Sequence, residues 1–281
     1  DIHATFATVG FLFCNDKKEL LGSLPTVLPD YTKIKYSPYA GNYLDQLGTS
    51  EQEDIYHYGH SLIQLIKQHP QHEIGTHTFS HYYCLEGASL ESFEADLICA
   101  KKVATENGIE IKSIVFPRNQ YSNLHIALCK KHGMTSYRGN EVANIYQPRK
   151  NNDLSLKLRM VRLLDSYFNL TGHNTHEVFK QDRDEIANIP SSAFLRPYSK
   201  KTNLLRPLQL RRIKNSLLHA AKNGKTYHLW WHPHNFGSHL EENLDLLRQI
   251  LAYYQELHQQ YGLSSCTMTE IANKIRNTNE G

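Results

Sequence analysis

Two histidines four positions apart are the sharpest chemical signal in this sequence. His77 and His81 close the segment EIGTHTFSH (73–81), directly after a run with the composition of a short strand. At that spacing two imidazoles would lie on one face of a helical turn and could reach one metal ion at about 2.0–2.1 Å. The alternative is two ordinary histidines with no joint role, because the chain contains 17 histidines. The spacing predicts a metal site behind this strand.

A second group of reactive residues follows another apolar run, in Trp230-Trp231-His232-Pro233-His234-Asn235. An imidazole beside bulky rings that exclude water can serve as a general acid or base, or as a metal ligand. His232 is the first candidate and His234 the second. The alternative is a strand that simply ends in a polar turn.

A third strand-like run leads into Phe116-Pro117-Arg118-Asn119-Gln120. The planar guanidinium of Arg118 could orient a carboxylate or bind another anion. A surface arginine behind a strand-ending proline is the alternative. Three such polar segments, converging on one face of the fold, are stronger evidence for a functional site than any one of them alone.

The elements that must position these residues alternate between strand and helix along the chain. This alternation favours βαβ units and a parallel sheet or barrel, whose strand-end loops would build the site. The polar stretch 139–205 is expected to be an insertion over that face. The predicted strands are 3–13, 72–78, 112–116, 135–138, 226–232 and 264–268, and the predicted helices are 51–69, 88–107, 122–132, 207–222, 240–260 and a last one to about 276.

Composition excludes several classes of protein. With 281 residues, 40% hydrophobic and 21% charged, the chain can bury a full core and is not disordered. Its net charge of +3 is too slight to argue for nucleic acid or a membrane surface, and no apolar run is long enough to span a bilayer. Five widely spaced cysteines without a C-x-x-C pair fit reduced thiols, so we expect a cytoplasmic protein.

Together these segments resemble the polysaccharide deacetylases, also called the NodB-homology group or carbohydrate esterase family 4. ATFATVG (4–10) looks like that family's ATFF-x-x-G strand. EIGTHTFSH is similar to its EIGxHTxxH motif, in which both histidines hold the metal. The resemblance therefore implies that His77 and His81 are metal ligands, and that residues 1–281 form one domain with a distorted (β/α) barrel fold.

Two further motifs extend the resemblance. LWWHPHN (229–235) looks like the family's last motif, a strand ending Leu-x-His, which implies that His232 is catalytic. VFPRNQ (115–120) lies where the third motif falls, although here Pro117 precedes Arg118, in the reverse of the family's usual order.

The chain departs from the family in its first motif, an Asp-Asp pair that supplies a metal ligand and the general base. No such pair occurs in this sequence, and Asp1 lies too close to ATFATVG to take that part. We therefore expect that the chain lacks a first βα unit of about 30 residues, and that its site is incomplete.

The resemblance implies metal-dependent hydrolysis of an N-acetyl group on an amino sugar of a polysaccharide or glycan precursor. A divalent ion, zinc above all, would be held by the two histidines and an aspartate. His232 would protonate the leaving amine, and Arg118 would hold the base. Candidate contacts to the N-acetylated glycan are Tyr121, Trp231, His234 and Arg138. The polar segments 165–167 and 171–176 are further candidates, with plain surface as the alternative.

Two other functions remain open at this point. The missing aspartates favour a catalytically inactive carbohydrate-binding member of the same fold. A metal-dependent amidase that acts on a non-sugar amide would use the same residues. The sequence offers no signal for nucleic acid as a partner.

Overall fold

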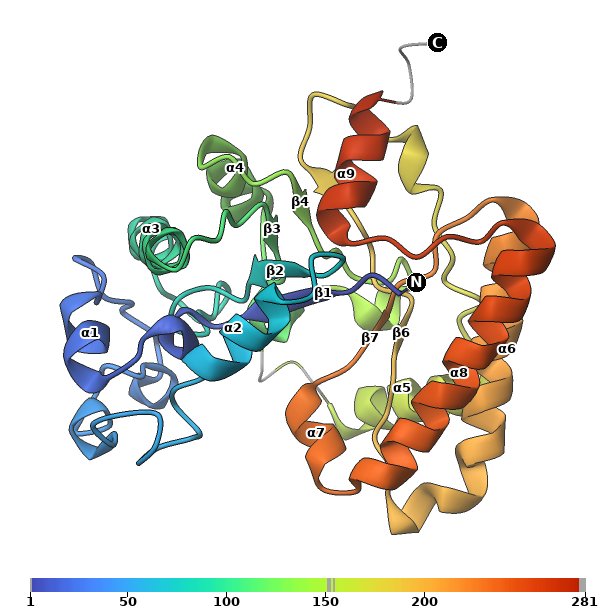
Figure 1. Cartoon of the computed structure of the whole chain (residues 1–281), viewed down its shortest axis with the longest axis horizontal. Coiled ribbons are helices and arrows are strands. Elements are labelled where there is room, and N and C mark those ends of the chain that lie inside the picture. The colour runs from blue at the N-terminus through green and yellow to red at the C-terminus, as the bar shows by residue number, and fades with distance from the viewer. Residues whose placement is uncertain (1, 151–152, 154, 278–281) are drawn as a thin grey trace.

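The centre of the molecule is a parallel sheet. The computed structural model describes residues 2–150, 153 and 155–277. Within that part of the chain, five strands lie parallel and side by side in their sequence order (Figure 1). The prediction of an α/β fold with a parallel sheet is confirmed. The strands are β1 (Thr5–Thr8), β2 (Glu73–Thr76), β3 (Ser113–Ile114), β4 (Ser136–Tyr137) and β5 (Ala187–Asn188).

A second parallel pair continues from the end of this sheet. It consists of β6 (Ala193–Phe194) and β7 (Leu229–Trp230). The chain between β5 and β6 stays extended: the amide of Ser191 donates to the carbonyl of Gly139 at 2.9 Å, and the amide of Leu195 donates to the carbonyl of Trp230 at 2.8 Å. The continuous segment from β5 to β6 therefore pairs first with β4 and then with β7. Because both pairings are parallel, the strands of the two sheets have their carboxyl ends on the same side.

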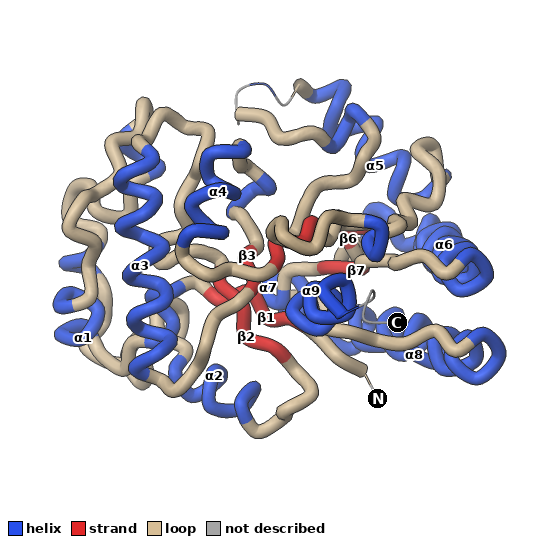
Figure 2. The backbone as a smooth tube through the Cα atoms, turned by 90° about the horizontal axis from the view of Figure 1, so that it is seen from above, coloured by secondary structure: helices blue, strands red, loops and turns tan. Residues whose placement is uncertain are grey.

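Helices surround the strands, which lie at the centre of the view in Figure 2. Most of the long predicted helices are confirmed within one or two residues. Short 3-10 turns connect the rest: η1 (Gly10–Phe13), η2 (Ile34–Tyr36), η3 (Leu44–Gln46), η4 (Pro117–Asn119), η5 (Asn144–Tyr146), η7 (Val178–Lys180) and η8 (Lys200–Leu205). The helices are α1 (Lys17–Gly22), α2 (His60–Lys67), α3 (Leu90–Glu106), α4 (Asn123–Lys131), α5 (Leu156–Phe168), α6 (Arg206–Asn223), α7 (Pro233–Gly237), α8 (Leu240–Tyr261) and α9 (Met268–Asn277).

The helices bury separate apolar clusters. The side of α3 that faces the sheet packs Phe93 and Leu97 against Ile114 of β3 and Phe116 behind it. On the other side of the molecule, α6 and α8 enclose a cluster that includes Leu195, and α9 closes a third cluster. This burial of apolar surface is the main force that holds the strand ends in place.

A glycine allows β2 and β3 to approach closely. A Cβ atom on Gly75 would clash with the hydroxyl oxygen of Ser113 and would lie 3.1 Å from the carbonyl oxygen of the same residue. The glycine in EIGTHT is therefore required by strand packing, whatever chemistry the following histidines perform.

Several predicted elements differ from the structure. The predicted strand 3–13 forms β1 only as far as Thr8 and continues as η1, and the predicted strand 226–232 is a strand only in β7. Residues 51–59 form turns instead of the first part of a helix, and Ile55, expected on its apolar face, is 69% exposed. The segment 264–267 is no strand: the Ser265 hydroxyl accepts from the His3 amide at 2.9 Å and donates to the His3 carbonyl at 3.0 Å. The side chain of Ser265 therefore takes the place of the backbone groups that would pair with His3 in a sheet. The stretch 139–205 contains α5, β5 and β6, for which the sequence showed no signal.

Among the residues that the structure describes, no helix is both long and apolar enough to cross a membrane.

Candidate functional site

The predicted site residues lie at the carboxyl ends of the strands. His77 directly follows β2, Arg118 follows β3 in η4, Arg138 directly follows β4, and His232 lies two residues after β7. Because all these strands are parallel, their carboxyl ends share one edge, where loops of α/β proteins collect functional groups.

The rings of the two histidines in EIGTHTFSH lie side by side, although the helical turn predicted for them is absent. Thr78 and His81 have left-handed backbone conformations, with φ of 66° and 58°, and residues 77–83 form neither helix nor strand. The ring centroids of His77 and His81 are nevertheless 4.8 Å apart. Left-handed non-glycine residues are strained and persist only where other contacts impose them.

Asp96 of α3 imposes this loop conformation. Its fully buried carboxylate accepts hydrogen bonds from the amides of Phe79 at 2.6 Å and Ser80 at 3.1 Å, and from the Ser80 hydroxyl. Burial raises the pKa of Asp96 to about 6, while these hydrogen bonds act in the opposite direction. The sequence analysis missed this residue, although an aspartate among the apolar positions of a predicted helix is a signal for such a role.

His77 is held in one tautomer. Its Nδ1 lies 2.7 Å from the carbonyl oxygen of Val115, and a carbonyl can only accept, so Nδ1 carries the proton and Nε2 keeps its lone pair. Burial, together with the nearby His81 and Arg138, holds the pKa of His77 well below its usual value. A neutral imidazole whose other nitrogen donates to a carbonyl is the form that binds metals in proteins.

His81 lies beside a cation. Burial first, and then the charge of Arg118, lowers the pKa of His81 to about 4. The Arg118 guanidinium stacks over Tyr83, 4.1 Å from the ring centroid, and also faces Tyr36 at 5.4 Å. Both aromatic contacts were missed by the sequence analysis. They hold Arg118 in a left-handed backbone conformation, with φ of 53°, at the end of β3.

His232 lies among aromatic rings. Its ring centroid is 5.3 Å from that of Trp230, 5.7 Å from that of Phe194 and 5.2 Å from that of His234. Burial first, and then His234 and Arg138, lowers its pKa, and its own charge acts on His77 and His81. The predicted role of His232, to protonate the leaving amine, needs an imidazolium, and these surroundings favour the neutral ring.

Arg138 connects the ends of β3 and β7. It donates to the side-chain oxygen of Asn119 at 2.7 Å, and its guanidinium lies 4.1 Å from the centroid of Trp230. The side chain is 8% exposed, and its buried Nε has no hydrogen-bond partner among the described residues. Tyr121 packs nearby against Tyr137 at 5.5 Å.

Other predicted contacts lie elsewhere. Trp231 stacks on Phe236, 5.7 Å away, within the cluster under α6 and α8. Asp165 lies in α5, has no exposed surface and accepts from Arg212 at 2.9 Å, so the prediction that it contacts a sugar is wrong. Asp1 lies outside the described residues.

The donor set fits a metal only in part. Two neutral imidazoles suit zinc, but zinc sites in proteins use at least three protein ligands. Residues 2–150, 153 and 155–277 contain no group of three or more His, Cys, Asp and Glu side chains that could hold a metal ion. Arg118 and Arg138 bring positive charge to the same edge, which opposes a bare dication.

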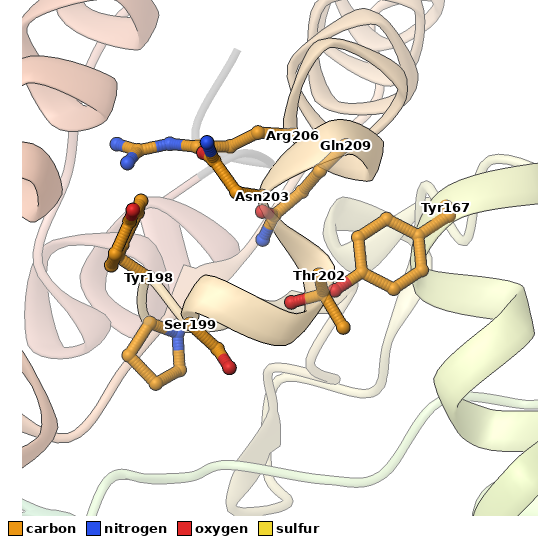
Figure 3. Close-up of a pocket in the computed structure, with 8 residues that line it drawn as sticks. Tyr167, Tyr198, Ser199, Thr202, Asn203, Arg206 and Gln209 are labelled. Carbon is orange, nitrogen blue, oxygen red and sulfur yellow. The ribbon is translucent and has the colours of Figure 1, made fainter.

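Two hollows are formed largely by other residues. The first, beside η8 and α6, is lined by Tyr167, Thr202 and Gln209, but its volume of about 10 Å³ admits only about one water molecule (Figure 3). The second, about 420 Å³, includes His72 and Glu73 at the amino end of β2. The first hollow includes Tyr167 of the predicted contacts in 165–176, and the second includes none of the predicted site residues.

No protein-family model matches this chain, and no curated protein matches it. Its function is therefore inferred from the residues and their geometry.

Proposed function

We propose that the chain is a metal-dependent hydrolase that removes N-acetyl groups from an amino sugar. The observation that carries the proposal is the meeting of His77 and His81 at 4.8 Å, with Nε2 of His77 unprotonated, on the same strand edge as His232. This arrangement is consistent with the roles that the resemblance to polysaccharide deacetylases implies for these residues.

The corresponding fold would be a distorted (β/α) barrel. The sequential order of β1 to β5 and the continuation through β6 to β7 support it. Closure would involve the segment 264–267, since Ser265 bonds to His3 just before β1. Such a barrel would leave all the strand-end loops on one face.

In this proposal His77 and His81 would hold the metal through ring nitrogens. A bound zinc ion would polarise the acetyl carbonyl and acidify water. His232, whose lowered pKa favours the neutral ring, would receive at a ring nitrogen the proton that the attacking water loses to the base, and would pass it to the leaving amine as the carbon–nitrogen bond breaks. The rings of Trp230 and Phe194 exclude water around that transfer.

The two arginines bind negative charge in this scheme. Arg118, held by its tyrosine contacts, offers N–H groups to a carboxylate beside His81, as the resemblance implies for the arginine of the third motif. The proposal requires a carboxylate that acts as third ligand and base, and the described residues supply none in reach of the two imidazoles.

Acetate release from N-acetylglucosamine oligosaccharides by the zinc-loaded protein tests this function. We expect release by the wild type and its loss in His77→Ala and His232→Ala. His72→Ala is the matched control, because His72 is also partly buried but lies at the amino end of β2. Unchanged release in His77→Ala would overturn the assignment.

The incomplete ligand set specifically favours the second candidate, a carbohydrate-binding protein of the same fold without catalysis. Binding of the same oligosaccharides without acetate release would establish it. Release of acetate from a simple N-acetylated amine, but not from the sugar, would instead identify an amidase.

A further inference from the structure

Helix α5 exposes its apolar face. Leu156, Met160, Leu164 and Phe168 are 80%, 62%, 41% and 52% exposed. Residues spaced by four lie on one side of a helix, so these side chains form a continuous stripe, with Val161 beside it. Isolated apolar residues on a surface are ordinary, but a stripe along a whole helix marks an interaction site.

In its last turn α5 buries polar groups, Asp165 and Ser166, beside the ring of Tyr167. Asp165 accepts from the Tyr146 hydroxyl at 2.7 Å and pairs with Arg212 of α6 at 2.9 Å. Ser166 accepts from Nε of Arg196 at 2.7 Å. An ordinary surface helix buries its apolar side and exposes its polar side. Here the buried hydrogen bonds fix the reverse orientation, so the outward stripe follows from specific contacts.

The exposed charges of α5 are all positive. Lys157 and Arg159 are exposed, while Asp165, the single acidic residue of the helix, is fully buried. In the segment before the helix, Lys150 and Asp153 are both exposed and offset each other in charge. The helix itself combines exposed large apolar side chains with exposed cations and buries its own acid, which matches an anionic bilayer, where long basic side chains reach the head groups.

The attachment points place α5 at the same end of the molecule as the candidate site. Arg196, which bonds to Ser166, lies two residues after the carboxyl end of β6. Asn140, three residues after β4, donates to the carbonyl of Tyr146, whose hydroxyl binds Asp165. Figure 1 shows α5 on the side of the sheets from which α7 also leaves.

We propose that α5 is a membrane-surface helix that binds anionic lipid bilayers. Its apolar stripe would enter the boundary between head groups and acyl chains, while Lys157 and Arg159 contact anionic head groups. The candidate site would then lie close to the lipid surface. The proposal is independent of the hydrolase function, because lipid binding requires neither metal nor turnover.

Co-sedimentation with vesicles tests this inference. We expect the wild type to bind vesicles of 70% phosphatidylcholine and 30% phosphatidylglycerol at least tenfold more tightly than pure phosphatidylcholine vesicles. Met160→Glu combined with Leu164→Glu should weaken binding to the anionic vesicles at least tenfold, because it removes two inserted side chains and adds negative charge. Lys157→Glu combined with Arg159→Glu should weaken it to a similar extent.

Leu124→Glu on α4 is the matched control, because Leu124 is 61% exposed but lies outside the stripe. It should bind vesicles like the wild type, and unchanged melting temperatures should show that every variant folds. Absence of vesicle binding by the wild type, or equal binding by the α5 variants, would overturn the proposal. So would a dimer that forms in solution without vesicle binding and dissociates in the Met160→Glu/Leu164→Glu variant, since a second copy would then cover the stripe.

Discussion

The Nδ1 atom of His77 lies 2.7 Å from the carbonyl oxygen of Val115, so the chain after β3 sets the tautomer of an imidazole that follows β2. The bond also fixes the plane of the ring and directs Nε2 away from the strand. Orientation of this kind costs little at the moment of binding, because the ring is already immobile. His77 is therefore a preorganised metal ligand at the carboxyl ends of the strands.

Removal of either imidazole should weaken zinc binding. Because His77 and His81 are the two adjacent donors, His77→Ala or His81→Ala should lower zinc affinity by at least about tenfold. Competition with a chromogenic chelator measures this change. His72→Ala should retain the wild-type affinity, and equal affinity in all four proteins would place any bound zinc elsewhere.

Asp96 should control the loop that carries His81. Asp96→Ala leaves the amides of Phe79 and Ser80 and the Ser80 hydroxyl without an acceptor, so we expect a loss of about 3 kcal/mol or more in the free energy of unfolding. Asp96→Asn keeps one acceptor and should lose less. Urea unfolding measures both, with Glu91→Gln, an exposed acid on the same helix, as control. If Asp96→Ala matched that control, the loop would not depend on this carboxylate.

The long helices could be predicted because their signals are local. Ser89 caps α3 by accepting from the amide of Ser92, and Gly224 ends α6 in a left-handed conformation. By contrast, β5 and β6 have two residues each, too few to show any periodicity. Their position depends on pairing with β4 and β7, which no local pattern encodes.

The candidate site was predictable in position but not in geometry. His77 and Arg118 follow neighbouring parallel strands of one sheet, so their convergence follows from the fold class. His232 follows β7 of the second sheet, and its place near them depends on the extended segment that joins β5 to β6. The meeting of His77 with His81 depends instead on Asp96, which lies on another element. The exposed apolar stripe of α5 was missed for a similar reason. Its orientation depends on the buried pair of Asp165 with Arg212 of α6, and neither net charge nor periodicity predicts that pair.

Breaking the ion pair between Asp165 and Arg212 should lower the free energy of unfolding strongly. Both side chains are buried and lie 2.9 Å apart, so Asp165→Ala or Arg212→Ala leaves an unpaired buried charge at a cost of about 3–5 kcal/mol. The combination Asp165→Leu/Arg212→Met should cost less than the sum of the single changes. Urea unfolding of the full double-mutant cycle measures the coupling. Strict additivity would show that the two residues act separately.

Gly75→Ala should loosen the contact between β2 and β3. The new methyl group would meet the hydroxyl of Ser113, and overpacking of this kind costs about 1–3 kcal/mol. Adding Ser113→Ala should recover part of that loss, because it removes the clashing oxygen. Thermal unfolding compares these variants with Gly22→Ala, where a Cβ atom meets nothing within 4 Å. A loss at Gly22 equal to that at Gly75 would contradict the packing explanation.

His125 should make stability fall with acid. Its ring is 5% exposed, packs edge-on to Phe93 at 4.9 Å, and has a pKa lowered to about 4 by burial. An unfolded histidine titrates near 6.5, so between about pH 6.5 and 4 the unfolded chain binds more protons, and acidification through this range should cost up to about 3 kcal/mol at this residue. Urea unfolding from pH 7 to 4 should show a shallower pH dependence for His125→Leu than for the exposed control His69→Leu. Identical pH dependence in both variants would mean that His125 remains neutral in the unfolded chain or charges freely in the folded one.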